Sequence, residues 1–67
     1  MKSVIRIANM RTLADINNIR EAISKNEGII ACQINKDKQE VNVIYDDYFI
    51  NEEDLIQCLE DSGYSTV

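Results

Sequence analysis

The chain has 67 residues, and its 12 acidic side chains against 7 basic ones give a net charge of −5. This length makes one domain, residues 1–67, whose small interior leaves little room for a substrate cavity, so we do not expect an enzyme. The charge argues against nucleic acid binding, and no apolar run is long enough to span a bilayer. The N-terminus enters a strand pattern without a signal peptide, so we expect a cytoplasmic protein whose cysteines, Cys32 and Cys58, stay reduced.

The first part of the chain has the pattern of a strand followed by a half-buried helix. Residues 3–8 are rich in β-branched side chains, with Ile5 and Ile7 on one face. A helix should follow and stop before Gly28. Its inner stripe is predicted to consist of Leu13, Ile16, Ile19 and Ile23.

Two further strands are predicted in the middle of the chain. Ile29–Asn35 forms one, and residues 41–45 form the other, with Val41, Val43 and Tyr45 pointing inward. The polar residues 36–40 between them suit a hairpin connection.

A second helix should begin after Asn51 as its N-cap and end at Gly63. Its first turn is acidic, and these negative charges are stabilised by the positive end of the helix dipole. Its inner stripe is predicted to consist of Leu55, Cys58, Leu59 and Ser62. With residues 64–67 as a short final strand, the order β-α-β-β-α-β predicts an α+β, ferredoxin-like sandwich: a four-stranded antiparallel sheet with two helices on one face.

Several short segments are weak signals singly but specific as an ordered set. They are Ile5-x-Ile7 before Met10, Glu27-Gly28-Ile29, Val41-x-Val43-x-Tyr45-Asp46, Glu53-x-Leu55-Ile56 and Gly63-Tyr64. This set resembles the heavy-metal-associated domain, which is the fold of copper chaperones and of the N-terminal modules of copper-transporting ATPases. The resemblance covers nearly the whole chain.

The departure from this family lies at its metal site. Residues 9–15 read Asn-Met-Arg-Thr-Leu-Ala-Asp where the family carries Gly-Met-x-Cys-x-x-Cys, so Thr12 and Asp15 stand in the places of the two thiolates. Copper(I) is a soft ion that selects thiolate and thioether ligands, whereas hydroxyl and carboxylate oxygens suit hard cations. Arg11 adds a positive charge to the same loop. We therefore expect tight copper(I) binding to be lost and no cofactor to be held.

The two replacing residues also have a structural interpretation. Thr12-x-x-Asp15 has the form of a capping box at the start of the first helix. Met10 is expected to pack inward, although a thioether ligand remains the alternative. Tyr64 follows Gly63 where the family's aromatic ring shields the metal loop, and here it is expected to cover the start of the first helix.

The two cysteines and the open face of the sheet complete the set of candidates. Cys32 and Cys58 are interpreted as small core residues, the alternative being a relocated metal pair. The outer strands, Ile29–Asn35 and residues 64–67, offer edges to which a second copy can add. The face away from the helices should carry Val4, Arg6, Ala8, Ala31, Gln33, Asn42 and Ile44.

The leading hypothesis is a stand-alone, non-catalytic binding module with a degenerate metal site. Its interaction loop would comprise Met10, Arg11, Thr12 and Asp15, next to Tyr64 and the acidic second helix. The partner would be a metal-transport ATPase-like protein or another copy of the chain, which would then be a monomer or a weak homo-oligomer. The alternative is a metal-trafficking accessory that binds an ion weakly, or with non-thiolate ligands, through Met10 and Asp15.

Overall fold

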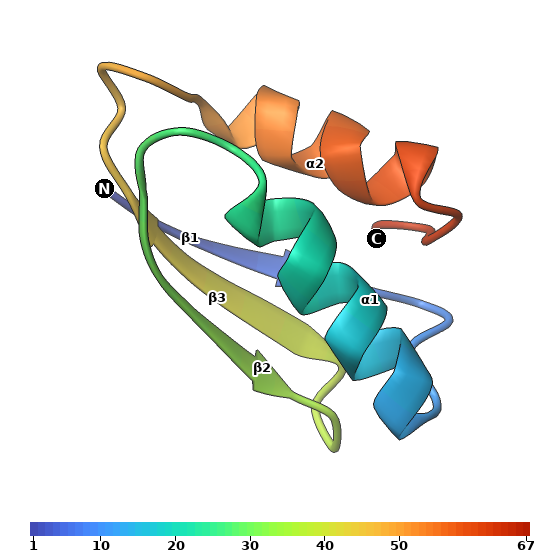
Figure 1. The fold of residues 1–67 in the computed structure, drawn as a ribbon. Helices are drawn as coiled ribbons and strands as arrows, with labels where there is room; N and C mark the ends of the chain where they lie inside the picture. Colours follow the sequence, from blue (N-terminus) through green and yellow to red (C-terminus); the bar gives the residue numbers. More distant parts are fainter.

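The structure, a computed structural model, describes residues 1–67 and contains three strands and two helices. Figure 1 shows the two helices lying together over one face of the sheet. In chain order, the elements are β1 (Lys2–Arg6), α1 (Leu13–Ser24), β2 (Ile29–Asn35), β3 (Glu40–Tyr45) and α2 (Glu52–Asp61). The predicted helices and the first three predicted strands are confirmed, with small changes at their ends.

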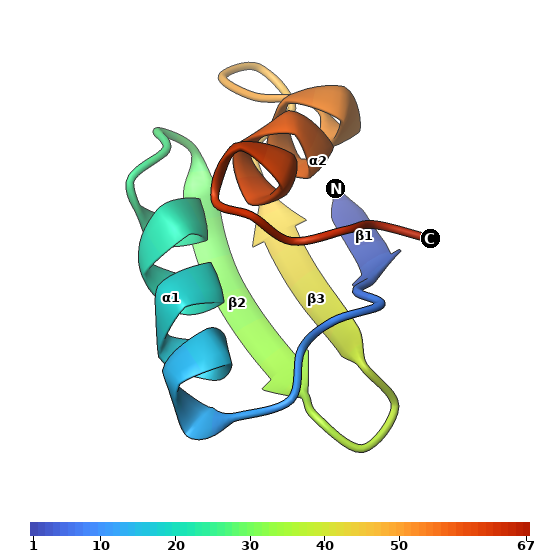
Figure 2. The same ribbon diagram turned by 90° about the vertical axis from the view of Figure 1, so that its right-hand side faces the viewer.

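The sheet is antiparallel and has the order β1-β3-β2, so β3 lies in the centre. Ile5 pairs with Val41 on one side of β3, and Ile34 pairs with Val41 on the other side. Viewed along the sheet, both helices cover the same face and leave the other face open (Figure 2). This arrangement confirms the ferredoxin-like α+β architecture.

The predicted fourth strand is wrong. Residues 64–67 run beside β1, but they form only an isolated antiparallel bridge between Ile7 and Thr66. Two backbone hydrogen bonds accompany this bridge, from Ala8 N to Ser65 O at 2.8 Å and from Val67 N to Arg6 O at 3.0 Å. They reach only Arg6, the last residue of β1, and Ala8 beyond it, so no continuous ladder forms and the sheet has three strands.

The core lies between the sheet and the helices, where the predicted inward positions of the strands are buried. Two positions of the predicted helix stripes are wrong. Leu13 is 74% exposed because six residues at 3.6 per turn place it about 120° around the helix from the fully buried Ile19. Ser62 lies beyond the end of α2 as its C-cap and is exposed. The core consists of Ile5, Ile7, Met10, Ile19, Ile23, Val41, Val43, Tyr45, Ile50, Leu55, Leu59 and Tyr64.

Three connections meet at one end of the sandwich. The Ile7 N–H donates to Gln39 O at 2.9 Å, which joins the end of β1 to the β2–β3 turn. Gln39 has a positive φ of 54° in this turn. Asn9 bonds to Gly63 and Ser65, which joins the same loop to the segment after α2. The loop of residues 9–12, which leads into α1, is therefore held between two other connections.

Neither helix has the length and apolar composition that crossing a membrane would require.

Candidate functional site

The loop before α1 forms the predicted capping box. Thr12 has the extended backbone of an N-cap, with φ −124° and ψ 167°, and its Oγ1 accepts from the Asp15 N–H at 3.2 Å. In return, the Thr12 N–H donates to Asp15 Oδ2 at 3.0 Å. Two backbone N–H groups at the start of the helix, those of Thr12 and Asp15, are thus satisfied by side chains of the same turn. The capping interpretation of Thr12 and Asp15 is confirmed.

The Asp15 carboxylate accepts more hydrogen bonds than capping requires. Its Oδ2 also receives the Arg11 N–H at 2.8 Å, and its Oδ1 receives the Tyr64 hydroxyl at 2.9 Å. The backbone N–H groups of Arg11 and Thr12, followed by the Tyr64 hydroxyl, lower the pKa of Asp15 because they stabilise the ionised form. Asp15 is therefore an anion whose two oxygens are both engaged.

Tyr64 closes the loop from the side of the C-terminal segment. Its ring is buried in the core, and its hydroxyl receives the Asn18 amide at 3.3 Å while donating to Asp15. Burial raises the pKa of Tyr64, and the hydrogen bond to the Asp15 carboxylate raises it further. The expectation that Tyr64 covers the start of the first helix is confirmed.

Met10 packs into the core and does not face the loop. Its side chain has 0% exposure and belongs to the central hydrophobic cluster. Its carbonyl accepts from Gln39 Nε2 at 2.9 Å. The inward packing of Met10 is confirmed, and the thioether sulfur is not available at the surface.

Asn9 and Gln39 hold the loop in place, and neither was identified from the sequence. The Asn9 amide donates to Gly63 O at 3.1 Å, and its Oδ1 accepts from Ser65 N at 2.9 Å. One signal pointed to Asn9, because it occupies the place of a glycine in the resembled family. No local signal marks Gln39, whose contact with Met10 spans 29 positions along the chain.

The five residues predicted to form the interaction site differ in their exposure. Arg11 and Thr12 are exposed, and the Arg11 side chain forms no salt bridge. Asp15 is half-buried, whereas Met10 and Tyr64 are buried. The structure thus brings all five together, but it presents Arg11 and Thr12 outward, next to the exposed side chain of Leu13.

The donor set of this loop does not fit copper(I). The Thr12 hydroxyl and both Asp15 oxygens are occupied by hydrogen bonds, and the Met10 sulfur is enclosed by core side chains. Hydroxyl and carboxylate oxygens are also hard ligands. Nowhere in the chain do three or more Cys, Asp or Glu side chains converge in a way that could hold a metal ion.

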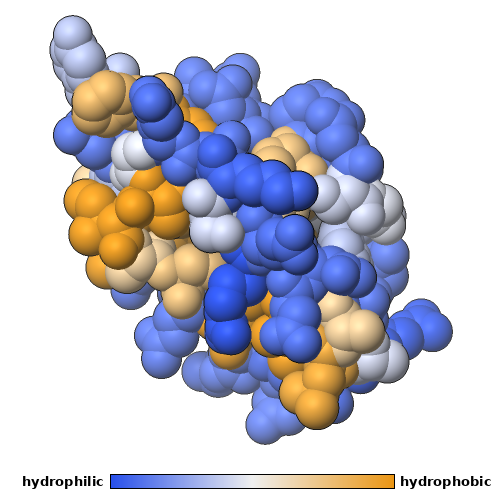
Figure 3. Space-filling view, viewed as in Figure 1, coloured by the Kyte–Doolittle hydropathy of each residue, from blue (hydrophilic) through white to orange (hydrophobic).

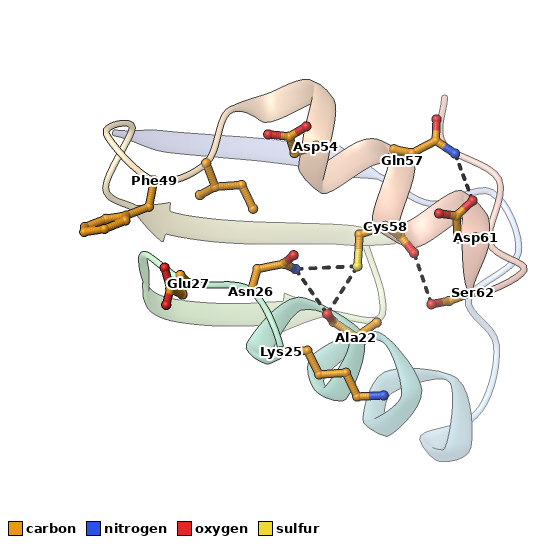
Figure 4. Close-up of a pocket in the computed structure, with 11 residues that line it drawn as sticks. Ala22, Lys25, Asn26, Glu27, Phe49, Asp54, Gln57, Cys58, Asp61 and Ser62 are labelled. Atoms are coloured by element: carbon orange, nitrogen blue, oxygen red, sulfur yellow. Dashed lines mark hydrogen bonds between the residues drawn. The ribbon is translucent and has the colours of Figure 1, made fainter.

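The two cysteines are free and half-buried, with Cys32 on β2 and Cys58 on α2. Cys32 packs against the core from β2, and burial raises the pKa of its thiol. Cys58 lies between the helices, where its Sγ donates to Ala22 O at 3.2 Å and accepts from the Asn26 amide at 3.5 Å (Figure 4). These contacts agree with the interpretation of both thiols as packed side chains.

An open groove of about 500 Å³ runs along the contact between α1 and α2 beside Cys58. Figure 4 shows Lys25 and Glu27 on its α1 side and Asp54 and Asp61 on its α2 side. The groove holds no converging ligand set. The α2 side of the groove belongs to an acidic helix. The first turn of α2 carries Glu52, Glu53 and Asp54, and its last turn has no basic residue.

Known proteins resemble this chain in sequence and in fold. No protein-family profile matches the chain. A copper chaperone, CopZ of Staphylococcus haemolyticus (strain JCSC1435), is 28% identical over 64 residues, which cover 96% of this chain and 94% of the relative.

Two solved structures share the fold. A CopZ metallochaperone superposes with a TM-score of 0.96 at 21% identity and covers 100% of both chains. A copper binding domain from HMA7, a P-type ATPase, superposes with a TM-score of 0.93 at 21% identity and covers 98% of this chain and 89% of its own. The predicted resemblance is supported: the chain is similar in sequence to a copper chaperone, and it shares the fold of a metallochaperone and of a copper binding domain.

Proposed function

We propose that this domain is a non-catalytic, cytoplasmic binding module in which a hydrogen-bonded helix start replaces the metal site of its relatives. The observation that carries the proposal is the state of Asp15. Its carboxylate accepts three hydrogen bonds, from the Arg11 N–H, the Thr12 N–H and the Tyr64 hydroxyl, so a metal ion would have to compete with these donors for both carboxylate oxygens.

The energetics of the loop oppose metal binding in two further ways. Copper(I) would have to take the Met10 sulfur out of the core, and removing a buried Met side chain typically costs about 2–5 kcal/mol. The exposed Arg11 guanidinium would repel any approaching cation. The loop therefore favours contacts with a protein over contacts with an ion.

The surface that such contacts would use consists of Arg11, Thr12 and Leu13, all exposed, with the acidic side of α2 as a second candidate region. Leu13 is an apolar side chain with 74% exposure beside a cation, which suits a partner with an apolar pocket and a nearby carboxylate. The similarity to a copper binding domain from a P-type ATPase supports a metal-transport ATPase-like partner.

Titration with copper(I) under reducing conditions, against a chromophoric chelator, tests the proposal. The wild-type protein should leave the copper(I) bound to the chelator. The double variant Thr12→Cys, Asp15→Cys should remove one equivalent of copper(I) from the chelator, because it places two thiolates at the helix start. A second control, Cys32→Ser with Cys58→Ser, identifies binding by the half-buried thiols. Stoichiometric, tight binding by the wild-type loop in that control would overturn the proposal.

The alternative, a metal-trafficking accessory that uses Met10 and Asp15, is tested by Asp15→Asn. If Asp15 is a ligand, this variant should weaken the binding of hard divalent cations, measured by isothermal titration. If Asp15 is only a cap, ion affinity should stay the same while the stability of the protein falls.

A further inference from the structure

The two edges of the sheet differ in their charge and in how far other segments cover them. The β1 edge carries the charged residues Lys2 and Arg6 and is covered at its end by the segment that bridges Ile7 to Thr66. The β2 edge, Ile29–Asn35, contains no charged residue and no proline, and no segment of the chain pairs with its outer side. In a chain with 28% charged residues, this strand lacks the usual protection against pairing with another strand.

The register of the sheet identifies the unpaired backbone groups of β2. Tyr45 exchanges two backbone hydrogen bonds, both of 3.0 Å, with Met1, so its N–H and C=O groups point away from β2. Along an antiparallel strand these backbone groups point alternately to one neighbouring strand and to the other. The N–H and C=O groups of Ile44 therefore point to its β2 partner, Ala31. By the same alternation along β2, the N–H and C=O groups of Cys32 and Ile34 point outward.

The surface near the start of this edge is also apolar. Ile30, at the bulge in β2, is 69% exposed, and Ile44, on the neighbouring strand β3, is 42% exposed on the open face of the sheet. Figure 3 shows apolar surface gathered beside the start of β2, while the surface over the two helices is mostly hydrophilic.

We propose that a second copy of this chain pairs with the β2 edge, so that two three-stranded sheets join into one continuous antiparallel sheet. The bulge interrupts β2 between Ile29 and Ala31, which leaves the regular segment from Ala31 to Asn35 for pairing. A two-fold axis at its centre, Gln33, sets Cys32 opposite Ile34 of the partner subunit, so the free donors and acceptors of both residues in both copies are satisfied.

A second copy suits this edge better than a foreign strand does. Pairing one strand with itself about a two-fold axis is closed and uses the same patch on both copies. Two chains of net charge −5 repel each other, and the uncharged β2 edge is the place where they can meet without opposing like charges. At the axis, the exposed Gln33 faces Gln33 of the partner subunit, and two amides can hydrogen-bond to each other.

Opposite charges placed at Gln33 test both the dimer and its register. Sedimentation equilibrium of the wild type should show a dimer fraction that rises with concentration. Gln33→Lys and Gln33→Glu should each raise the dimer dissociation constant by about fivefold or more, because like charges then lie directly opposite each other. An equimolar mixture of the two variants should form a heterodimer. Gln57→Lys, on the exposed face of α2, is the control and should leave the dimer unchanged.

Hydrogen exchange supplies the second measurement, and the variants must stay folded by circular dichroism. The Cys32 and Ile34 amides should become protected as the concentration rises in the wild type and not in Gln33→Lys. A wild type that stays monomeric up to the millimolar range would overturn the proposal. So would a dimer that neither Gln33→Lys nor Gln33→Glu weakens, because the copies would then meet elsewhere.

Discussion

The two helices begin with the same motif, but only the first motif is connected to distant parts of the chain. Thr12 and Asn51 are both extended N-caps, and an aspartate stands three residues after each. In α2, the Asp54 carboxylate accepts one hydrogen bond, from the Asn51 N–H at 3.4 Å. In α1, the Asp15 carboxylate accepts three, and one of them comes from Tyr64, which lies 49 positions away.

This difference separates the two tasks of the first loop. A capping box needs only the residues of one turn, as α2 shows. The additional contacts of Asp15, the burial of Met10 and the bonds of Asn9 to Gly63 and Ser65 do not serve the cap. They hold the loop closed against the C-terminal segment, so both carboxylate oxygens of Asp15 are already engaged at the start of α1.

The largest expected effect comes from the core anchor of the first loop. Met10→Ala should lower the free energy of unfolding by about 2–5 kcal/mol because it leaves a cavity at a site with 0% exposure. Met10→Leu, which nearly conserves the volume, should cost less than about 1.5 kcal/mol. Urea unfolding measures both. A loss in Met10→Ala as small as that of an exposed residue would show that the loop does not depend on this anchor.

The next effect is a dependence of stability on pH that the capping box of α1 supplies through Asp15. The folded-state pKa of Asp15 is lowered, so its contribution is complete above the ordinary aspartate pKa and is lost as the pH falls through the folded value. Unfolding measured in acid should therefore show a loss of stability that is smaller in Asp15→Asn. In Asp54→Asn that acid-induced loss should persist. An identical acid response in both variants would mean that the Tyr64 and Arg11 contacts add nothing.

The smallest effect is the one that the two helix starts share. Thr12→Ala and Asn51→Ala should each lower the free energy of unfolding by about 1 kcal/mol, because each removes one side-chain acceptor from an N-cap. Thermal unfolding followed by circular dichroism compares them directly. If Thr12→Ala costs several times more than Asn51→Ala, the Thr12 hydroxyl also takes part in closing the loop.

Local patterns predicted most of the fold. The strand faces of Val41, Val43 and Tyr45, the Thr12–Asp15 capping box and the N-cap role of Asn51 depend on residues a few positions apart, and these features were predicted. The errors arose where a local pattern was extended too far. Leu13 was placed on the inner stripe although it lies on another side of the helix, and residues 64–67 were assigned a full strand although they form one bridge.

The candidate site was predicted less completely. The sequence indicated that Thr12 and Asp15 replace the expected thiolates and cap the helix, and that Met10 points inward. It did not indicate that Asn9 and Gln39 hold the loop, because those contacts join residues 29 to 56 positions apart and have no periodic pattern. It also left both sheet edges as equal candidates for pairing, whereas the structure covers part of one and leaves the other open.

The sequence by itself determined the order of the elements, their apolar faces and the two helix starts, since propensity, periodicity and capping act within one or two turns. Only the tertiary structure decided that the loop at residues 9–15 is closed. That closure requires the Tyr64 hydroxyl, the Asn9 amide and the Met10 side chain to reach partners that the folded chain alone brings together. What began as a loop without thiolates is, in the folded molecule, a helix start whose polar atoms are already bonded.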